Sequence, residues 1–159
     1  MRAVDFGLCV CFVLFAFTSF VYEPYVTFAI DLREASDPIG RSWFWYADSF
    51  DPLFLDTPMW LRIMCTIDFI PFGCMHLFSL YCFLTKREVV RSPGLLYAGA
   101  LLYSTLVYFG YEFIEERDRA DLLWMFLINV PYTIMPVVLA WRLWGTEPLW
   151  ERQEKPKST

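Results

Sequence analysis

Asp68 is an acidic residue inside the mostly apolar stretch LRIMCTIDFIPFGCMHLFSLYCFL, residues 61–84. A carboxylate at the centre of a membrane helix costs about 2.5–3.5 kcal/mol to insert, whereas each Leu, Ile or Phe contributes about 0.3–0.6 kcal/mol in favour. The stretch can therefore insert, but its acid should face the interior of a helix bundle and not lipid. A buried negative charge there can bind a protonated amine or accept a hydrogen bond from a hydroxyl group.

The surroundings of Asp68 are predicted to be soft and apolar. Helical spacing places four side chains on its face: Met64, Cys65, Phe72 and Met75. The alternative is a structural role, in which Asp68 pairs with Arg62 or contacts Tyr132 to hold helices together. Arg62 lies off the face of Asp68, which disfavours that pair. We predict a ligand pocket that includes Asp68, Met64 and Phe72.

Other apolar stretches also carry polar groups. Asn129, Tyr132 and Thr133 share a helix face and either meet the acid across the bundle or bond between helices. Glu23 is a second candidate acid, and it either pairs with a neighbouring helix or faces water beside Pro24.

Prolines interrupt three of the apolar stretches. Each removes a backbone donor, and the resulting kinks would open space between helices, although membrane helices also tolerate proline without a functional reason. The four positions are Pro24, Pro71, Pro131 and Pro136.

The elements that would position these groups are four membrane-spanning helices. Of the 159 residues, 57% are hydrophobic, above the roughly 45–50% of ordinary soluble domains. A span needs about 20 apolar residues, which four stretches provide. The predicted fold is all-α, a polytopic four-helix bundle over 1–146 followed by a basic tail over 147–159. The predicted spans are 6–30, 60–84, 93–113 and 121–144. The first is too long, and lacks the cleavage site, for a signal peptide.

Charge sorts to the two sides of these spans. The 85–92 connection and the tail are basic, whereas the 31–59 and 114–121 connections are acidic. The positive-inside rule therefore predicts cytoplasmic termini and a luminal, ordered first loop rich in aromatic residues. The net charge of −5 gives no indication of nucleic-acid binding. The ending KPKST resembles a dilysine signal for the endoplasmic reticulum, or is an ordinary solvated tail.

Several separated motifs occur in an order typical of one family. WYADSFDPL, PMW and the acid of the second span are followed by VRSPGLLY in the third span and VPYTIMP in the fourth. Together they resemble the sigma-2 receptor (transmembrane protein 97) family of EXPERA-domain membrane proteins, over about residues 31–144. That resemblance implies an endoplasmic reticulum protein, usually dimeric, that binds sterols and cationic amphiphiles and takes part in cholesterol handling.

The resemblance also implies roles for individual residues. Asp31 would bind the amine with Asp68 as its carboxyl partner, and the two would share a proton. Asp51 would be the structural acid of the loop that closes the pocket, and Ser104 and Tyr132 would line it.

This chain departs from the family pattern at two positions. Asp68 stands where the family commonly has Glu, and Phe72 stands where it often has a polar residue. Both changes are expected to shift ligand preference.

Two other functions remain open on sequence grounds. A sterol isomerase needs an acid and a base on opposite sides of its substrate. His76 suggests such a site, but Leu80 stands one turn further on where an acid is expected, so His76 is predicted to be a packed or lipid-interface residue. A membrane adaptor would instead dock another membrane protein on its acidic loops.

No metal or cofactor is predicted, because the cysteines form no paired motif and the chain has one histidine. Gly94 and Ala98 allow close helix approach, either in a homodimer or within one chain.

Overall fold

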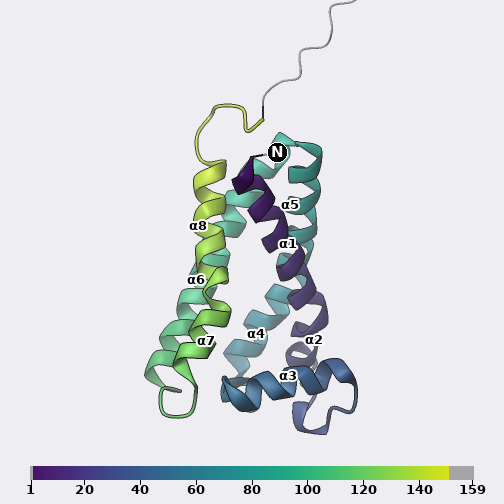
Figure 1. Cartoon of the computed structure of the whole chain (residues 1–159), viewed down its shortest axis with the longest axis vertical. Helices are drawn as coiled ribbons and strands as arrows, with labels where there is room; N and C mark the ends of the chain where they lie inside the picture. Colours follow the sequence, from purple (N-terminus) through teal and green to yellow (C-terminus); the bar gives the residue numbers. More distant parts are fainter. Residues whose placement is uncertain (1, 151–159) are drawn as a thin grey trace, which may run out of the picture.

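Four long helical spans make up the bundle, as the sequence predicts (Figure 1). The computed structural model describes residues 2–150, and within that range it contains helices and no strand. The tail from 151 onward, with its KPKST ending, lies outside the described residues. The spans are Ala3–Thr27, Met59–Thr85, Glu88–Ile114 and Leu122–Leu143. The all-α, four-span prediction is confirmed.

The spans run alternately up and down, so the N-terminus and the end of α8 lie at the same end of the bundle (Figure 1). We call this the terminal end, and the opposite end, which carries α3, the loop end. The helices are α1 (Ala3–Val21), α2 (Glu23–Thr27), α3 (Pro38–Ser49), α4 (Met59–Ile67), α5 (Gly73–Thr85), α6 (Arg91–Ile114), α7 (Leu122–Asn129) and α8 (Pro131–Leu143). Three-residue 3₁₀ turns occur at Leu32–Glu34, Pro52–Phe54 and Glu88–Val90.

Prolines set the interruptions in three spans. Pro24 lies in the first turn of α2, just after the break from α1 at Tyr22. Pro131 begins α8, and Pro71 lies in a π-helical turn, Asp68–Phe72, that joins α4 to α5. Proline cannot donate to the carbonyl one turn earlier, so the ladder breaks or widens at these points.

The first loop is ordered, as expected. Asp37 caps α3 by accepting hydrogen bonds from the N–H groups of Ile39 and Gly40. Asp56 then joins two connections, because it accepts bonds from both Arg33 and Arg119. Helix α3 lies across the loop end of the bundle (Figure 1).

Two hydrophobic clusters fill the bundle. The larger lies toward the terminal end between α1, α5, α6 and α8, and includes Phe12, Phe83 and Leu139. The smaller lies toward the loop end between α2, α4, α6 and α7, and includes Leu61 and Met125. Groups that come between the two clusters along the spans are therefore far from both ends.

Gly94 and Ala98 pack within the chain. A Cβ on Gly94 would lie 2.5 Å from Leu143 Cδ1 of α8, and Ala98 is buried. Gly94 therefore allows the close α6–α8 approach within the chain, and the homodimer alternative stays a prediction.

An ion pair that the sequence analysis missed closes the terminal end. Arg142 Nε donates to Asp5 Oδ1 at 2.7 Å, and both side chains are buried. Arg142 also donates to the Leu149 carbonyl, and its guanidinium lies over the Trp150 ring. The start of the predicted tail is thus tied to the bundle.

Removing one partner of this pair should destabilise the protein strongly. Asp5→Asn leaves the Arg142 charge buried and uncompensated, which typically costs about 3–5 kcal/mol. We expect a clearly lower unfolding temperature for Asp5→Asn in detergent, and a smaller loss for the exposed-site control Arg41→Gln. Equal unfolding temperatures for Asp5→Asn and the parent protein would contradict this role.

Candidate functional site

Asp68 begins the π-helical turn that joins α4 to α5. A π turn inserts an extra residue and reorients the side chains that follow, and such turns are frequent at functional sites. Pro71 favours this turn because it lacks the N–H that a regular α-helix would use there. Asp68 Oδ1 is buried and has no hydrogen-bond partner among the described residues. The carboxyl therefore faces the protein interior.

Glu23 is the carboxyl that the fold places near Asp68. The chain breaks at Tyr22, and Glu23 begins the short helix α2, which packs against α4 and the π turn. Its carboxyl interacts electrostatically with that of Asp68 and lies beside the Cys65 thiol. Glu23 Oε2 is also buried and unpartnered within the described chain.

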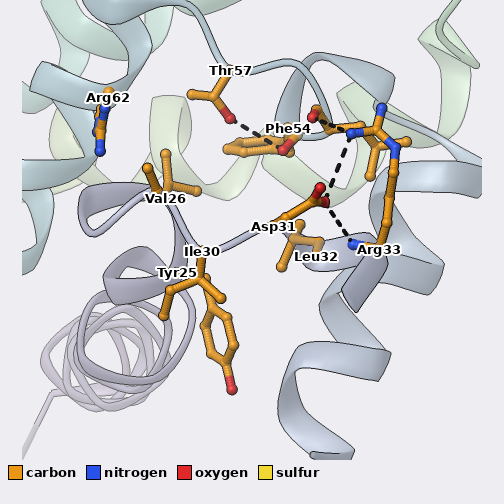
Figure 2. A pocket seen from close by; sticks show the side chains of 11 residues that line it. Tyr25, Val26, Ile30, Asp31, Leu32, Arg33, Phe54, Thr57 and Arg62 are labelled. Atoms are coloured by element: carbon orange, nitrogen blue, oxygen red, sulfur yellow. Dashed lines mark hydrogen bonds and ion pairs between the residues drawn. The ribbon is translucent and has the colours of Figure 1, made fainter. Parts of the chain in front are cut away.

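Asp31 lies elsewhere, in a separate pocket at the loop end (Figure 2). Its carboxylate accepts from the Arg33 N–H at 2.9 Å and lies 3.7 Å from the Arg33 guanidinium. Half of its side-chain surface is exposed. The first span ends at Thr27, three residues earlier than the predicted end at residue 30, so Asp31 lies four residues beyond the span. The structure thus brings Glu23, and not Asp31, beside Asp68.

Polar and aromatic side chains surround Asp68 on the side toward the terminal end. Asp68 lies beside the Ser19 hydroxyl, and Ser19 Oγ is 3.3 Å from His76 Nδ1. His76 is fully buried, with the rings of Phe15 and Tyr97 packed edge-on against it. The packed interpretation of His76 is therefore confirmed, and a polar chain runs from Asp68 through Ser19 to His76.

Several buried polar atoms without partners lie in this region, and a second set, Asp51 Oδ1 with both Glu112 carboxyl oxygens, lies near the loop end. Nearly all buried polar groups in proteins are hydrogen-bonded, and an unpaired one is costly. A group of such atoms indicates a place where a bound molecule or water supplies the missing partners. Of the twelve such atoms within the described residues, five belong to this region: Glu23 Oε2, Asp68 Oδ1, His76 Nε2, Ser79 Oγ and Tyr97 Oη. We call these residues, with Ser19 and Tyr132, the inner polar cluster.

Tyr132 reaches this cluster from α8, and its role in lining a ligand pocket stays a prediction. Its ring stacks on Phe15 with 3.9 Å between centroids, and its hydroxyl lies 2.5 Å from Thr18 Oγ1. Its backbone carbonyl meets Thr105 Oγ1 at 3.3 Å. Ser104 and Thr105 both donate to the Leu101 carbonyl of their own helix, and Ser104 makes no further bond in the described chain. The residue of α6 that reaches Tyr132 is thus Thr105, one position beyond the predicted Ser104.

The apolar residues predicted around Asp68 divide between the two hydrophobic clusters. Met64 packs on the loop-end cluster, whereas Phe72 packs on the terminal-end cluster and makes an edge-on contact with Tyr97. The π turn separates them, because it rotates residues after Asp68 relative to those before it.

Asp51 lies in a second polar group near the loop end. It is fully buried, and its Oδ2 accepts hydrogen bonds from the hydroxyls of Tyr46 and Tyr108. Asn129 Nδ2 donates to Tyr46 Oη at 2.8 Å, so Asn129 joins Asp51 and not Asp68. Glu112 lies beside Asp51 and is fully buried. This arrangement is consistent with a structural role for Asp51 in fixing the loop.

An apolar groove of about 320 Å³ lies between α1 and α8 toward the terminal end. The outer surface of the helices beside this groove is apolar, since the side chains of Val10 and Ile134 are exposed. The groove could accommodate a hydrocarbon body approaching from lipid. Its lining residues are Val4, Gly7, Leu8, Cys11, Pro131, Ile134, Met135 and Val138.

No group of three or more metal-ligating side chains occurs between residues 2 and 150. All five cysteines are free thiols; Cys9, Cys65 and Cys82 are buried, whereas Cys74 is exposed.

Stability should depend on pH through Asp51. Burial raises the pKa of Asp51 from an ordinary 3.8 to about 6, because the charged form loses its hydration. The folded protein therefore binds more protons than the unfolded chain between those values, and its stability should fall as pH rises from about 4 to 6. Above about pH 6 Asp51 is ionised in both the folded and the unfolded protein, so its titration no longer changes the stability.

The measurement is the unfolding temperature at pH 4.5 and pH 6.5, for the parent protein and for Asp51→Asn. The parent should lose more stability over this interval than the variant, whose amide does not titrate. An identical pH dependence in the two proteins would contradict the assignment to Asp51.

Comparison with known protein families identifies the family to which the chain belongs. Residues 38–143 match the EXPERA (EXPanded EBP superfamily) family. No curated protein and no solved structure gives a significant match. The matched region runs from the start of α3 to the end of α8, so it includes Asp68, His76 and Tyr132 but not Glu23. Together with the four membrane spans, this match shows that the chain is a membrane protein of the EXPERA family.

Proposed function

We propose that this EXPERA-family protein binds a sterol or a hydrophobic amine inside the membrane, at the inner polar cluster. The observation that carries the proposal is the pair of buried, unpartnered carboxyl oxygens, Glu23 Oε2 and Asp68 Oδ1. In hydrocarbon, where no water supplies partners, such oxygens require a donor. A ligand ammonium or hydroxyl group is a donor of the right kind.

The pairing of two carboxyls favours a ligand with a single positive charge. Neighbouring like charges in a low-dielectric interior resist ionising together, so the pair is expected to carry about one negative charge. One protonated amine then neutralises the site, whereas a dication would leave an excess charge buried. A neutral sterol hydroxyl would donate to the same oxygens with a weaker, uncharged bond.

The hydrophobic body of the ligand has suitable surfaces nearby. Aromatic rings of Phe15, Tyr97 and Tyr132 border the inner polar cluster. The groove between α1 and α8 supplies an apolar surface next to lipid. The polar head of the ligand would bind the carboxyl pair, and its apolar body would contact these walls. Ligand pockets are usually built in this way, with mostly apolar walls and a few polar groups that fix orientation.

Asp31 keeps a different part in this proposal. The family resemblance assigns it the ligand amine, and its position at the loop end makes it an outer acid that attracts a cation before the inner pair binds it. Localisation in the endoplasmic reticulum with cytoplasmic termini, a homodimer, and a part in sterol homeostasis or transport belong to the same proposal.

Binding measurements on single substitutions test the inner pair. Asp68→Asn and Glu23→Gln should each lower the affinity of the purified protein for a radiolabelled lipophilic amine by about tenfold or more, because a charge-assisted hydrogen bond contributes about 1.5–3 kcal/mol. Asp48→Asn, at an exposed acid of α3, is the matched control and should leave affinity unchanged. Loss of binding in Asp31→Asn but in neither inner variant would place the amine at the loop-end pocket.

Proton transfer is a second candidate function, favoured by the chain from Asp68 through Ser19 to His76. His76 Nε2 has no partner in the described chain and could exchange a proton with a bound sterol. An isomerase also needs a second group on the opposite side of the substrate, and Glu23 is the nearest candidate.

Expression in cells that lack their own sterol isomerase separates the two functions. An enzyme would change the sterol profile, and His76→Gln would abolish that change while leaving the protein folded. A binding protein would leave the profile unchanged and still capture the radiolabelled amine.

A further inference from the structure

The loop end contains a polar pocket that the proposed function does not use for its bound ligand. Its volume is about 230 Å³, several times the roughly 30 Å³ that a water molecule occupies in the liquid. That space suits a small polar group better than a whole sterol. The lining residues are Tyr25, Val26, Ala29, Ile30, Asp31, Leu32, Arg33, Phe54, Leu55, Thr57 and Arg62.

Two arginines and one acid give this lining a net positive charge within an acidic connection. Arg33 is already engaged by Asp31, by Asp56 and by the Leu55 carbonyl. The Arg62 side chain makes one hydrogen bond in the described chain, from Nε to the Thr27 carbonyl at 3.2 Å. It takes part in no ion pair between residues 2 and 150.

The remaining donors of Arg62 are suited to an anion. A guanidinium carries five N–H donors, and its two outer nitrogens form the planar fork that binds phosphate. The bond from Nε fixes the stem of Arg62 against the end of α2 and leaves that fork unengaged. Figure 2 shows Arg62 and Arg33 on opposite sides of the pocket, with Asp31 between them.

The pocket lies at the level where the spans end. Its residues come from the end of the first span at Thr27 and the start of the second at Met59. Large apolar side chains next to it are exposed, namely Phe28, Ile30, Met59 and Ile63. These side chains would contact acyl chains, so the pocket faces the headgroup layer of the bilayer.

We propose that this pocket binds the headgroup of a membrane phospholipid, with the phosphate on Arg62 and a headgroup amine toward Asp31. Basic pockets beside membrane helices bind lipid phosphates by the same physics. Asp31 adds selectivity, because it attracts the ammonium of phosphatidylethanolamine and repels a purely anionic headgroup. The proposal is independent of ligand binding at the inner polar cluster.

The test is a lipid titration of the purified full-length protein in detergent, followed by native mass spectrometry. The probes are dioleoylphosphatidylethanolamine, dioleoylphosphatidylglycerol and dioleoylglycerol, which lacks phosphate. Dioleoylphosphatidylethanolamine should bind at least about tenfold more weakly to Arg62→Gln than to the parent protein, because the charged phosphate contacts are lost. Arg62→Lys should recover part of this affinity, and the exposed-site control Arg41→Gln should match the parent protein.

Asp31→Asn tests the other half of the site and keeps the proposal testable if Arg62→Gln does not fold. It should raise affinity for the glycerol phospholipid relative to the ethanolamine one, in a protein whose unfolding temperature is little changed. Dioleoylglycerol binding as tightly as the phospholipids would overturn the proposal, as would unchanged lipid affinity in Arg62→Gln. Displacement of dioleoylphosphatidylethanolamine by millimolar inorganic phosphate alone would reassign the pocket to free phosphate.

Discussion

The absence of water in the bilayer core is the constraint on which this structure depends. Every buried polar group must find its partner inside the protein or in a bound molecule. At the terminal end the protein meets this demand itself, since Arg142 and Asp5 satisfy each other. Near the middle it does not, because Glu23 and Asp68 are two neighbouring acids, each with a buried oxygen that has no partner among the described residues. That contrast distinguishes a structural ion pair from a binding site within one bundle.

The interruptions of the helices are what make the inner site. In an uninterrupted first span, the direction of the Glu23 side chain would be set by the helix axis of α1. The break at Tyr22 instead starts a separate helix, α2, which carries Glu23 and packs against α4. In the second span, the π turn at Pro71 joins α4 to α5, and Met64 before it and Phe72 at its end pack on different hydrophobic clusters. Backbone irregularity and buried charge thus occur at the same level, and π turns are frequent at functional sites.

Sequence alone predicted the features that depend on local pattern. Hydrophobic run length predicted four spans, and the cost of a charge in lipid predicted an inward-facing Asp68. Features that depend on long-range register were missed. Asp5 and Arg142 are at opposite ends of the chain, and no spacing rule connects them. The choice between Ser104 and Thr105 is one residue, or about 100° around a helix, which hydrophobicity does not resolve.

The carboxyl partner of Asp68 was also beyond sequence reasoning. The family resemblance favoured Asp31, but the first span ends before that residue. The most direct test compares a cationic amphiphile with its uncharged isostere, on the parent protein and on the double variant Glu23→Gln/Asp68→Asn. We expect the parent protein to prefer the cation by at least about tenfold and the double variant to show no preference. A preference for the cation that survives in the double variant would contradict it.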